Sequence, residues 1–338
     1  MLLAVVIYGA IVLYRGVGEV SESLGAFAWS TFGIACALAA SNYLLRFLKW
    51  EYYLKLLDIR GIPKLESLLT FLSGFVLTIT PGKVGEVFKS LILAQTRGVP
   101  VVRSAPIVVA ERVTDLIGVI LIITLGSLTF QGGLIWASIG AAVVTALLVF
   151  IASRRLSAWV VRGLPHLPGF LGRIGARVGP KIGEALGGLR DLVTPKRLVW
   201  PTLLSVGAWS LEGLALWVIL GGFGEQTPIP LTAFFYATAT LAGALVPVPG
   251  GLGVTEKLLE EQLAQVGQVP SATATAAMLL VRLATLWFGV AVGFASLAIL
   301  RARHPGLRAE VPGNEAANGE PGPGPAQAPL ARAAKKSQ

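Results

Sequence analysis

The sequence has 338 residues, of which 54% are hydrophobic and 14% charged, and its formal net charge is +10. Because a soluble domain of this length carries about 25% charged residues, the composition excludes an ordinary soluble protein and indicates a polytopic membrane protein. The single cysteine, Cys36, excludes an internal disulfide. The two histidines, His166 and His304, give no metal-ligand spacing, and no phosphate-binding loop occurs, so we expect no metal, no cofactor and no enzymatic activity.

Apolar runs predict six full transmembrane helices, since each run approaches or exceeds the roughly 20 residues that cross a bilayer. The fold class is therefore all-α, because the alternating segments of about ten residues typical of a transmembrane barrel are absent from the sequence. The first run is short, and we expect a span rather than a signal peptide, since no basic residues precede it and no cleavage site is evident. The six predicted spans are 2–14, 26–45, 105–130, 134–151, 198–220 and 273–300. The second is followed by what reads as a basic and aromatic interface belt, formed by Arg46, Lys49, Trp50, Tyr52 and Tyr53.

Two further apolar segments, 65–94 and 231–266, contain helix breakers. The first is split at Pro81-Gly82 and the second within VPVPGGLGVTE, residues 246–256. Each half is too short to span, and broken backbone is tolerated in a membrane only inside protein or along a cavity. We therefore expect two re-entrant helical hairpins, although two tilted spans fit the same runs. The expected turn residues are Pro81, Gly82, Gly85, Pro249, Gly250, Gly251 and Gly253.

The positions of Lys and Arg predict the orientation. Residues 46–64 and 152–197 are rich in basic side chains, whereas the loops on the opposite side supply only Arg15. Because basic loops remain in the cytoplasm, both termini are expected on the cytoplasmic side of a bacterial-type inner membrane. The first hairpin then enters from the cytoplasm and the second from outside.

The two broken segments have similar surroundings. PGKVGE is followed by Arg112, 26 residues after Glu86, and PGGLGVTE is followed by Arg282, 26 residues after Glu256. Similar halves in opposite orientations form an inverted-topology repeat. The connector between the halves either lies on an anionic inner leaflet or is an ordinary basic link. The chain then divides into a short first span and outer loop (1–25), a first repeat (26–151), a basic amphipathic connector (152–197), a second repeat (198–303) and a disordered cytoplasmic tail (304–338).

Ionisable groups within the spans are candidates for function, because each costs at least about 2.5–3.5 kcal/mol to insert. A half-helix that begins after Pro-Gly directs unpaired N–H groups and its positive dipole end into the interior, which favours an anion. The carboxylates would balance charge, hold a cationic headgroup or exchange protons. The structural alternative is internal neutralisation, of Arg112 by Asp115 and of Arg282 by a glutamate. The candidate substrate-binding residues are Lys83, Glu86, Glu111, Arg112, Asp115, Glu212, Glu256 and Arg282.

Three motifs, TPGKVGEVFK, AERVTDLIGV and LVPVPGGLGVTEKLL, together with RFLKW after the second span, resemble the signature of the lysylphosphatidylglycerol synthase transmembrane-region family. The resemblance extends from about Leu24 to Leu300. That family includes the flippase part of multiple-peptide-resistance proteins and members linked to polyprenyl glycolipids or hopanoids. The resemblance implies a lipid translocase with inverted repeats and re-entrant helices.

By motif match, the residues that line its site would be Pro81, Gly82, Gly85, Glu86, Glu111, Arg112, Asp115, Pro249, Gly250, Gly251, Gly253 and Glu256. Two departures from the family pattern are evident. Lys83 stands where many members have arginine, and the chain contains no soluble aminoacyl-transferase domain, so we expect it not to synthesise lysylphosphatidylglycerol.

Residues and resemblance together predict a flippase or transporter for a phospholipid or polyprenyl-type glycolipid headgroup. Two alternatives stay open: a small-solute secondary transporter, and a membrane-embedded transferase or non-transporting partner of a lipid-synthesis enzyme. The expected partners are membrane lipids with charged headgroups and not nucleic acid. A homo-oligomer and a lipid-synthesis enzyme partner are left open.

Overall fold

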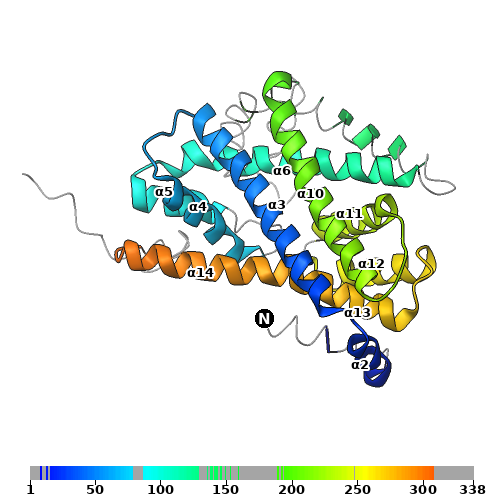
Figure 1. Cartoon of the computed structure of the whole chain (residues 1–338). Helices are drawn as coiled ribbons and strands as arrows, with labels where there is room; N and C mark the ends of the chain where they lie inside the picture. Colours follow the sequence, from blue (N-terminus) through cyan, green and yellow to red (C-terminus); the bar gives the residue numbers. More distant parts are fainter. Residues whose placement is uncertain are drawn as a thin grey trace, which may run out of the picture. The chain divides into compact units, whose positions relative to one another are not determined.

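The computed structural model describes residues 16–78, 87–128, 194–246 and 248–307, with single positions and short groups at 8, 9, 13, 135, 138, 139, 141–143, 145, 146, 149, 153, 159, 189 and 192. All regular structure in these ranges is helical (Figure 1). The predicted spans at 2–14 and 134–151, most of the connector, and the tail beyond Leu307 lie outside the described residues. The predicted turn of the first hairpin, within 79–86, also lies outside the described residues.

Within the described residues, three stretches of helix are long and apolar enough to cross a membrane. They are α3 (Trp29–Leu56), α10 (Pro195–Gly222) and the continuous run Ser271–Arg303. A helix of 28 residues is about 42 Å long, which exceeds the roughly 30 Å of a hydrocarbon core. These stretches coincide with three of the six predicted spans, so an all-helical chain with at least three candidate spans is confirmed.

The run Ser271–Arg303 is not uniform. It consists of α13 (Ser271–Arg282), the π-helical turn η5 (Leu283–Trp287) and α14 (Phe288–Arg303). A π-turn inside an α-helix is rare and occurs mostly at functional positions. Because this π-helical turn directly follows Arg282, that arginine is a candidate functional residue.

A fourth long helix, α6 (Val101–Ser127), has 27 residues and contains the charged side chains of the AERVTD motif. It begins a few residues before the predicted span at 105–130. A further helix, α2 (Val17–Gly25), forms where the sequence predicted an outer loop.

Proline marks where several helices begin. Pro fixes its own φ and lacks an N–H, so it suits the first positions of a helix, where N–H groups have no intrahelical partner. Proline stands at the N-cap of α4 (Lys64–Ser73), α6, α11 (Ile229–Leu245) and α13, and at the first residue of α10.

Helices α3 and α10 pack against each other in opposite directions (Figure 1). Asn42 Nδ2 of α3 donates to the carbonyl oxygen of Ala208 at 2.9 Å, and Lys49 Nζ donates to Ser205 Oγ at 2.8 Å. As the chain advances along α3, its partners therefore move backwards along α10. This antiparallel pair connects the two halves of the sequence.

The first broken segment forms an antiparallel pair of short helices. It comprises α4, the 3₁₀ turn η1 (Gly74–Leu77) and α5 (Phe88–Arg97). Arg97 pairs with Glu66 at the outer ends, and a side chain at Gly74 would meet Lys89 near the inner ends.

The second broken segment has the same design in α11 and α12 (Val254–Gln265). Gln262 Nε2 donates to Thr238 Oγ1 at 2.9 Å, and Gly243 approaches Thr255 near the turn. Both segments thus contain a pair of helices packed side by side, and the second is broken at Pro249–Gly251, within the region that the sequence indicated.

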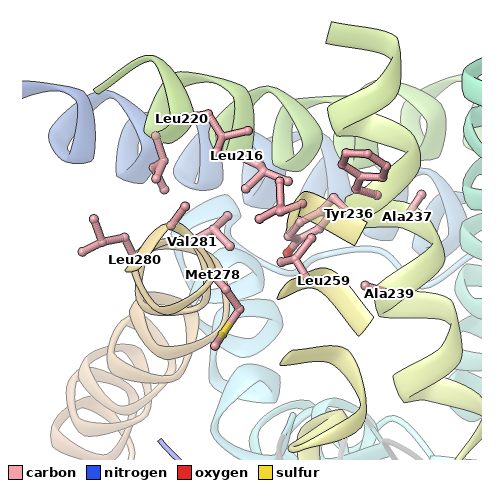
Figure 2. Close-up of a cluster of buried hydrophobic side chains, with 14 of the residues drawn as sticks. Leu216, Leu220, Tyr236, Ala237, Ala239, Leu259, Met278, Leu280 and Val281 are labelled. Atoms are coloured by element: carbon pink, nitrogen blue, oxygen red, sulfur yellow. The ribbon is translucent and has the colours of Figure 1, made fainter. Parts of the chain in front are cut away.

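The largest hydrophobic core joins α10, α11, α12 and α13. Figure 2 shows side chains from these four helices converging, among them Leu216, Tyr236, Leu259 and Met278. A second core lies around the later part of α3 and includes Trp50, Tyr53, Phe71 and Ile107. Leu189 and Leu192 of the predicted connector are buried in this second core.

The predicted end of the second span near residue 45 is wrong. Helix α3 continues to Leu56, and Lys49, Trp50 and Tyr53 are buried rather than placed in an interface belt. The reason is that α4, α6 and α10 cover this part of α3. Lys49, Trp50 and Tyr53 therefore face protein, whereas Lys55 near the end of α3 is exposed.

Candidate functional site

A cavity of about 80 Å³ lies where both broken segments approach the long helices. Thr78, just after η1, and Gly250 and Gly251, in the 3₁₀ turn η4 (Pro249–Gly251) of the second hairpin, belong to its wall. The charged residues that line it are Arg46, Glu212 and Arg282. Its remaining described lining is Tyr43, Phe75, Trp209, Tyr236, Thr240, Gly243, Ala244, Thr255, Thr285, Leu286 and Gly289.

Glycine is required at the turn of the second hairpin. Gly250, Gly251 and Gly253 have φ values of 64°, 69° and 86°, in the left-handed region that other residues rarely adopt. A Cβ on Gly251 would also lie 3.1 Å from the Cα of Gly243 on α11. The turn can therefore pack closely against α11 beside the cavity.

The second hairpin is closed by a cluster around Glu256, which we call the Glu256 cluster. Glu256 Oε1 accepts a 2.6 Å hydrogen bond from Arg282 Nε, and its Oε2 accepts one of 2.7 Å from the Gly253 N–H. A terminal nitrogen of Arg282 donates to the Gly250 carbonyl oxygen at 2.9 Å. The glutamate is fully buried and the arginine nearly so. Arg282 thus fastens the turn to α13.

A second group, the Asp115 cluster, joins α3, α6 and α10. Asp115 Oδ1 lies 2.5 Å from Lys49 Nζ and accepts a 3.0 Å hydrogen bond from Ser205 Oγ. Its other oxygen lies 3.4 Å from a terminal nitrogen of Arg46. The cluster places two cations on one carboxylate, and Arg46 extends from it to the cavity wall.

A third buried pair lies between α5 and α6. Lys89 Nζ donates to Glu111 Oε2 at 2.6 Å, and both side chains are almost fully buried. The same ammonium lies 4.9 Å from the Trp50 ring centroid and 5.1 Å from that of Phe71. Such cation–π contacts favour a desolvated cation. This pair ties the first hairpin to α6.

Glu212 of α10 is the one carboxylate among the described residues of the cavity wall. Asn42 Nδ2 donates to its Oε1 at 2.7 Å, and the Tyr236 hydroxyl donates to its Oε2 at 2.6 Å. Tyr236 also lies 3.0 Å from Thr285 Oγ1, and Tyr43 donates to the Thr285 carbonyl oxygen. Neutral donors therefore orient this carboxylate at the point where α3, α10, α11 and η5 meet.

The predicted site residues lie at different distances from the cavity. Arg282, Glu212, Gly250 and Gly251 line the cavity, whereas Glu256 lies directly behind Arg282. Three others are less close: Asp115 reaches the cavity through Arg46, and Glu111 and Arg112 are not among the described lining residues. Pro249 and Gly253 belong to the second turn. Lys83, Glu86, Pro81, Gly82 and Gly85 lie outside the described residues.

The sequence interpretation missed Arg46, Lys49 and Lys89 as buried functional candidates. Asn42, Arg46 and Lys49 have the i, i+4, i+7 spacing of one helical face. Ser205, Trp209 and Glu212 repeat that spacing on α10, and the two faces meet. A polar stripe continuing past residue 45 was therefore the signal that α3 faces protein there. Within the described part of the chain, no group of three or more His, Cys, Asp or Glu side chains could hold a metal ion.

Comparison with known proteins gives a match over residues 1–293 to the family described as "Lysylphosphatidylglycerol synthase TM region". The chain belongs to this family. The three relatives described next are each named "UPF0104 membrane protein" and come from Methanothermobacter thermautotrophicus.

One relative is 26% identical over 283 residues, which cover 76% of this chain and 79% of the relative. Another is 21% identical over 306 residues, which cover 86% of this chain and 90% of the relative. A third is 29% identical over 126 residues, covering 37% of each.

Family membership and the long apolar helices together show that the chain is a multi-pass, all-helical membrane protein. The relatives come from an archaeon. The bacterial-type membrane and the cytoplasmic termini expected from the sequence thus stay predictions.

Proposed function

We propose that this protein is a lipid flippase that moves a phospholipid or polyprenyl-type glycolipid headgroup across the cytoplasmic membrane. The observation that carries the proposal is the cavity between the two hairpins, lined by Arg46, Arg282 and Glu212 in a multi-pass membrane protein. Charges at such a depth are costly and typically mark a transport pathway. The family description names a lipid with a charged headgroup, which fits this lining.

An inverted repeat, with halves 26–151 and 198–303, is part of the proposal. Each half has the described order long helix, broken hairpin, long helix. Arg282 follows Arg112 by 170 residues, and Glu212 follows Asn42 by the same interval.

Asn42 and Glu212 are hydrogen-bonded to each other across the antiparallel α3 and α10. Contact between equivalent positions of antiparallel helices is what a two-fold axis in the membrane plane would produce. This contact supports the repeat. The 170-residue interval also makes Glu86 the equivalent of Glu256, so we expect Glu86 to pair with Arg112.

We further infer that both hairpins are re-entrant. Helices α4 and α5 have 10 residues each and α12 has 12, so they are about 15–18 Å long and cannot span a core of about 30 Å. In the expected topology the first hairpin enters from the cytoplasm and the second from outside. Their turns, at 81–86 and 249–253, then meet near the midplane.

In this mechanism the headgroup occupies the cavity while the acyl chains stay in lipid. Rocking of one repeat against the other exposes the cavity to each leaflet in turn. The arginines and the half-helix N-termini bind the anionic part, and the carboxylates balance charge. The substrate-binding set is Lys83, Glu86, Glu111, Arg112, Asp115, Glu212, Glu256 and Arg282.

Leaflet exchange in vesicles tests the proposal. The protein is reconstituted with fluorescent phosphatidylglycerol, and dithionite quenching measures how fast the inner-leaflet probe becomes accessible. We expect exchange well above protein-free vesicles, and a strong loss in Arg46→Gln. Arg301→Gln, at the exposed end of α14, is the matched control and keeps the full rate.

Exchange equal to that of protein-free vesicles, for phosphatidylglycerol and for a polyprenyl phosphate sugar alike, would reject the flippase. Uptake of a soluble anion under those conditions would favour a small-solute transporter. Absence of both activities would favour a non-transporting partner of a lipid-synthesis enzyme.

A further inference from the structure

Three residues of the cavity wall carry a buried polar atom for which the described chain offers no hydrogen-bond partner. These atoms are Arg46 Nε on α3, Trp209 Nε1 on α10 and Thr240 Oγ1 on α11. About 90% or more of buried polar groups in proteins are paired, because an unpaired one is costly. Three such atoms around one cavity, from three helices, indicate that their partner is a bound molecule.

The chemistry of the three groups defines that molecule. The guanidinium and indole N–H groups can only donate, and the threonine hydroxyl can donate as well. A ligand that satisfies all three must therefore offer several acceptor oxygens. An oxyanion such as phosphate does this, and its charge matches the guanidinium of Arg46.

Arg46 is better suited to bind an anion than Arg282. Arg282 already donates to Glu256 and to the Gly250 carbonyl at 2.6 and 2.9 Å. Among the described residues, Arg46 instead makes a 3.4 Å contact with Asp115, whose carboxylate Lys49 holds at 2.5 Å. Its ion pair is therefore longer than that of Arg282 with Glu256. The Phe75 ring, 5.8 Å from the guanidinium carbon, supports the side chain beside the cavity.

Glu212 limits how much negative charge the cavity can accept. Its carboxylate lines the same cavity, and Asn42 and Tyr236 fix its two oxygens there. Like charges that share a poorly solvated site repel strongly. A second charge on the ligand would therefore be opposed, whereas a single charge can be matched by Arg46.

We propose that Arg46, Trp209 and Thr240 form a subsite for a singly charged phosphodiester, and that Glu212 discriminates against phosphate monoesters. This deepens the lipid transport proposed above and, for its lipid source, rests on it. The three unpaired atoms are themselves shielded. Binding therefore requires their side chains to turn toward the phosphate.

Direct binding to the full-length protein in detergent tests the subsite without requiring transport. The probes are dihexanoyl phosphatidylglycerol, a diester, dihexanoyl phosphatidic acid, a monoester, and inorganic phosphate, measured by calorimetry at pH 8. At this pH the monoester carries nearly two charges. We expect the diester to bind at least about tenfold more tightly than the monoester.

Substitutions assign the donors. We expect Trp209→Phe and Thr240→Val each to weaken diester binding by about tenfold, as for a lost hydrogen bond to a charged group. Arg46→Gln should weaken it more. Glu212→Gln should strengthen monoester binding and bring the two lipids within about threefold. Trp200→Phe, at an exposed position of α10, and Arg301→Gln are the controls and should bind as the unmodified protein does.

Unchanged diester binding in both Trp209→Phe and Thr240→Val would overturn the subsite, and this holds even if Arg46→Gln fails to fold. No binding of any probe would mean that the cavity holds water only. A monoester preference that Glu212→Gln does not alter would reject the role of Glu212.

The two proposals fail separately. Diester binding that depends on the three donors, without leaflet exchange in vesicles, would keep the subsite and reject the flippase. Inorganic phosphate that binds as tightly as the diester would assign the donors to a soluble anion and reject the lipid source.

Discussion

The Glu256 cluster and the Asp115 cluster each contribute one arginine to the wall of one cavity and use their charges differently. In the first, one arginine meets one glutamate, and Arg282 also holds the Gly250 carbonyl. In the second, Lys49 and Arg46 share a single carboxylate, and Arg46 keeps an unpaired N–H. A buried ion pair whose hydrogen-bonding groups are paired fixes one element to another. A cluster in which cations outnumber carboxylates can instead bind an anion.

The largest difference between the clusters should come from removing their carboxylates. Glu256→Gln leaves one buried cation uncompensated, which typically costs about 3–5 kcal/mol. Asp115→Asn leaves two, so we expect it to lower the free energy of unfolding further. SDS titration of the purified protein measures both. Equal losses would show that Arg46 does not depend on Asp115.

Removing the arginines should destabilise the Glu256 cluster more than the Asp115 cluster, the reverse of the order expected for the carboxylates. Arg282→Gln leaves Glu256 buried without its cation, and we expect a loss of about 3–5 kcal/mol in unfolding free energy. Arg46→Gln should cost about 1 kcal/mol or less, because Lys49 still neutralises Asp115. The double variant Arg282→Leu with Glu256→Leu should recover most of the loss, since apolar replacement of a whole buried pair is often neutral. A loss for Arg46→Gln as large as for Arg282→Gln would contradict the distinction.

The two hairpins should also differ in their tolerance of a methyl group. A Cβ on Gly243 would collide with Thr255 and lie 3.2 Å from the Cα of Gly251, so backbone must move. We expect Gly243→Ala to cost about 1–3 kcal/mol. The three atoms nearest to a Cβ on Gly74 all belong to the Lys89 side chain, which shifts more readily than backbone, so Gly74→Ala should cost less. Thermal melting of the two variants side by side gives the order, and the reverse order would refute it.

The smallest effect is expected at an exposed pair near the Glu256 cluster. Lys257 and Glu261 lie 3.9 Å apart with the lysine side chain 76% exposed. Such pairs contribute little, so Lys257→Ala should leave melting and lipid binding unchanged. A clear loss would mean that charge density around α12, rather than the buried pairs, controls the site.

Much of the fold could be predicted from local sequence. Apolar length predicted α10 and the run Ser271–Arg303, and the Pro-Gly pair at Pro249 predicted the turn of the second hairpin. The end of α3 could not be read locally. Lys49 and Trp50 carry the composition of an interface, and only packing against α6 and α10 makes their positions interior.

The site was predictable where chemistry lies next to a break. Glu256 and the glycines of the second turn were found in this way, and Arg282 was found as a charge within the predicted span 273–300. The pairing of Arg282 with Glu256 was one of the alternatives that internal neutralisation allowed. Arg46, Trp209 and Thr240 were missed, because they lie on three different helices and come together only in the folded chain. No spacing within one segment could indicate such a set.

The π-helical turn at Leu283–Trp287 sets the relative phase of α13 and α14. One surplus residue in a helical turn offsets the residues after it by about 100° around the axis, compared with an unbroken α-helix. Arg282 can therefore face Glu256 while α14 presents a side to α4 that an uninterrupted helix would turn elsewhere.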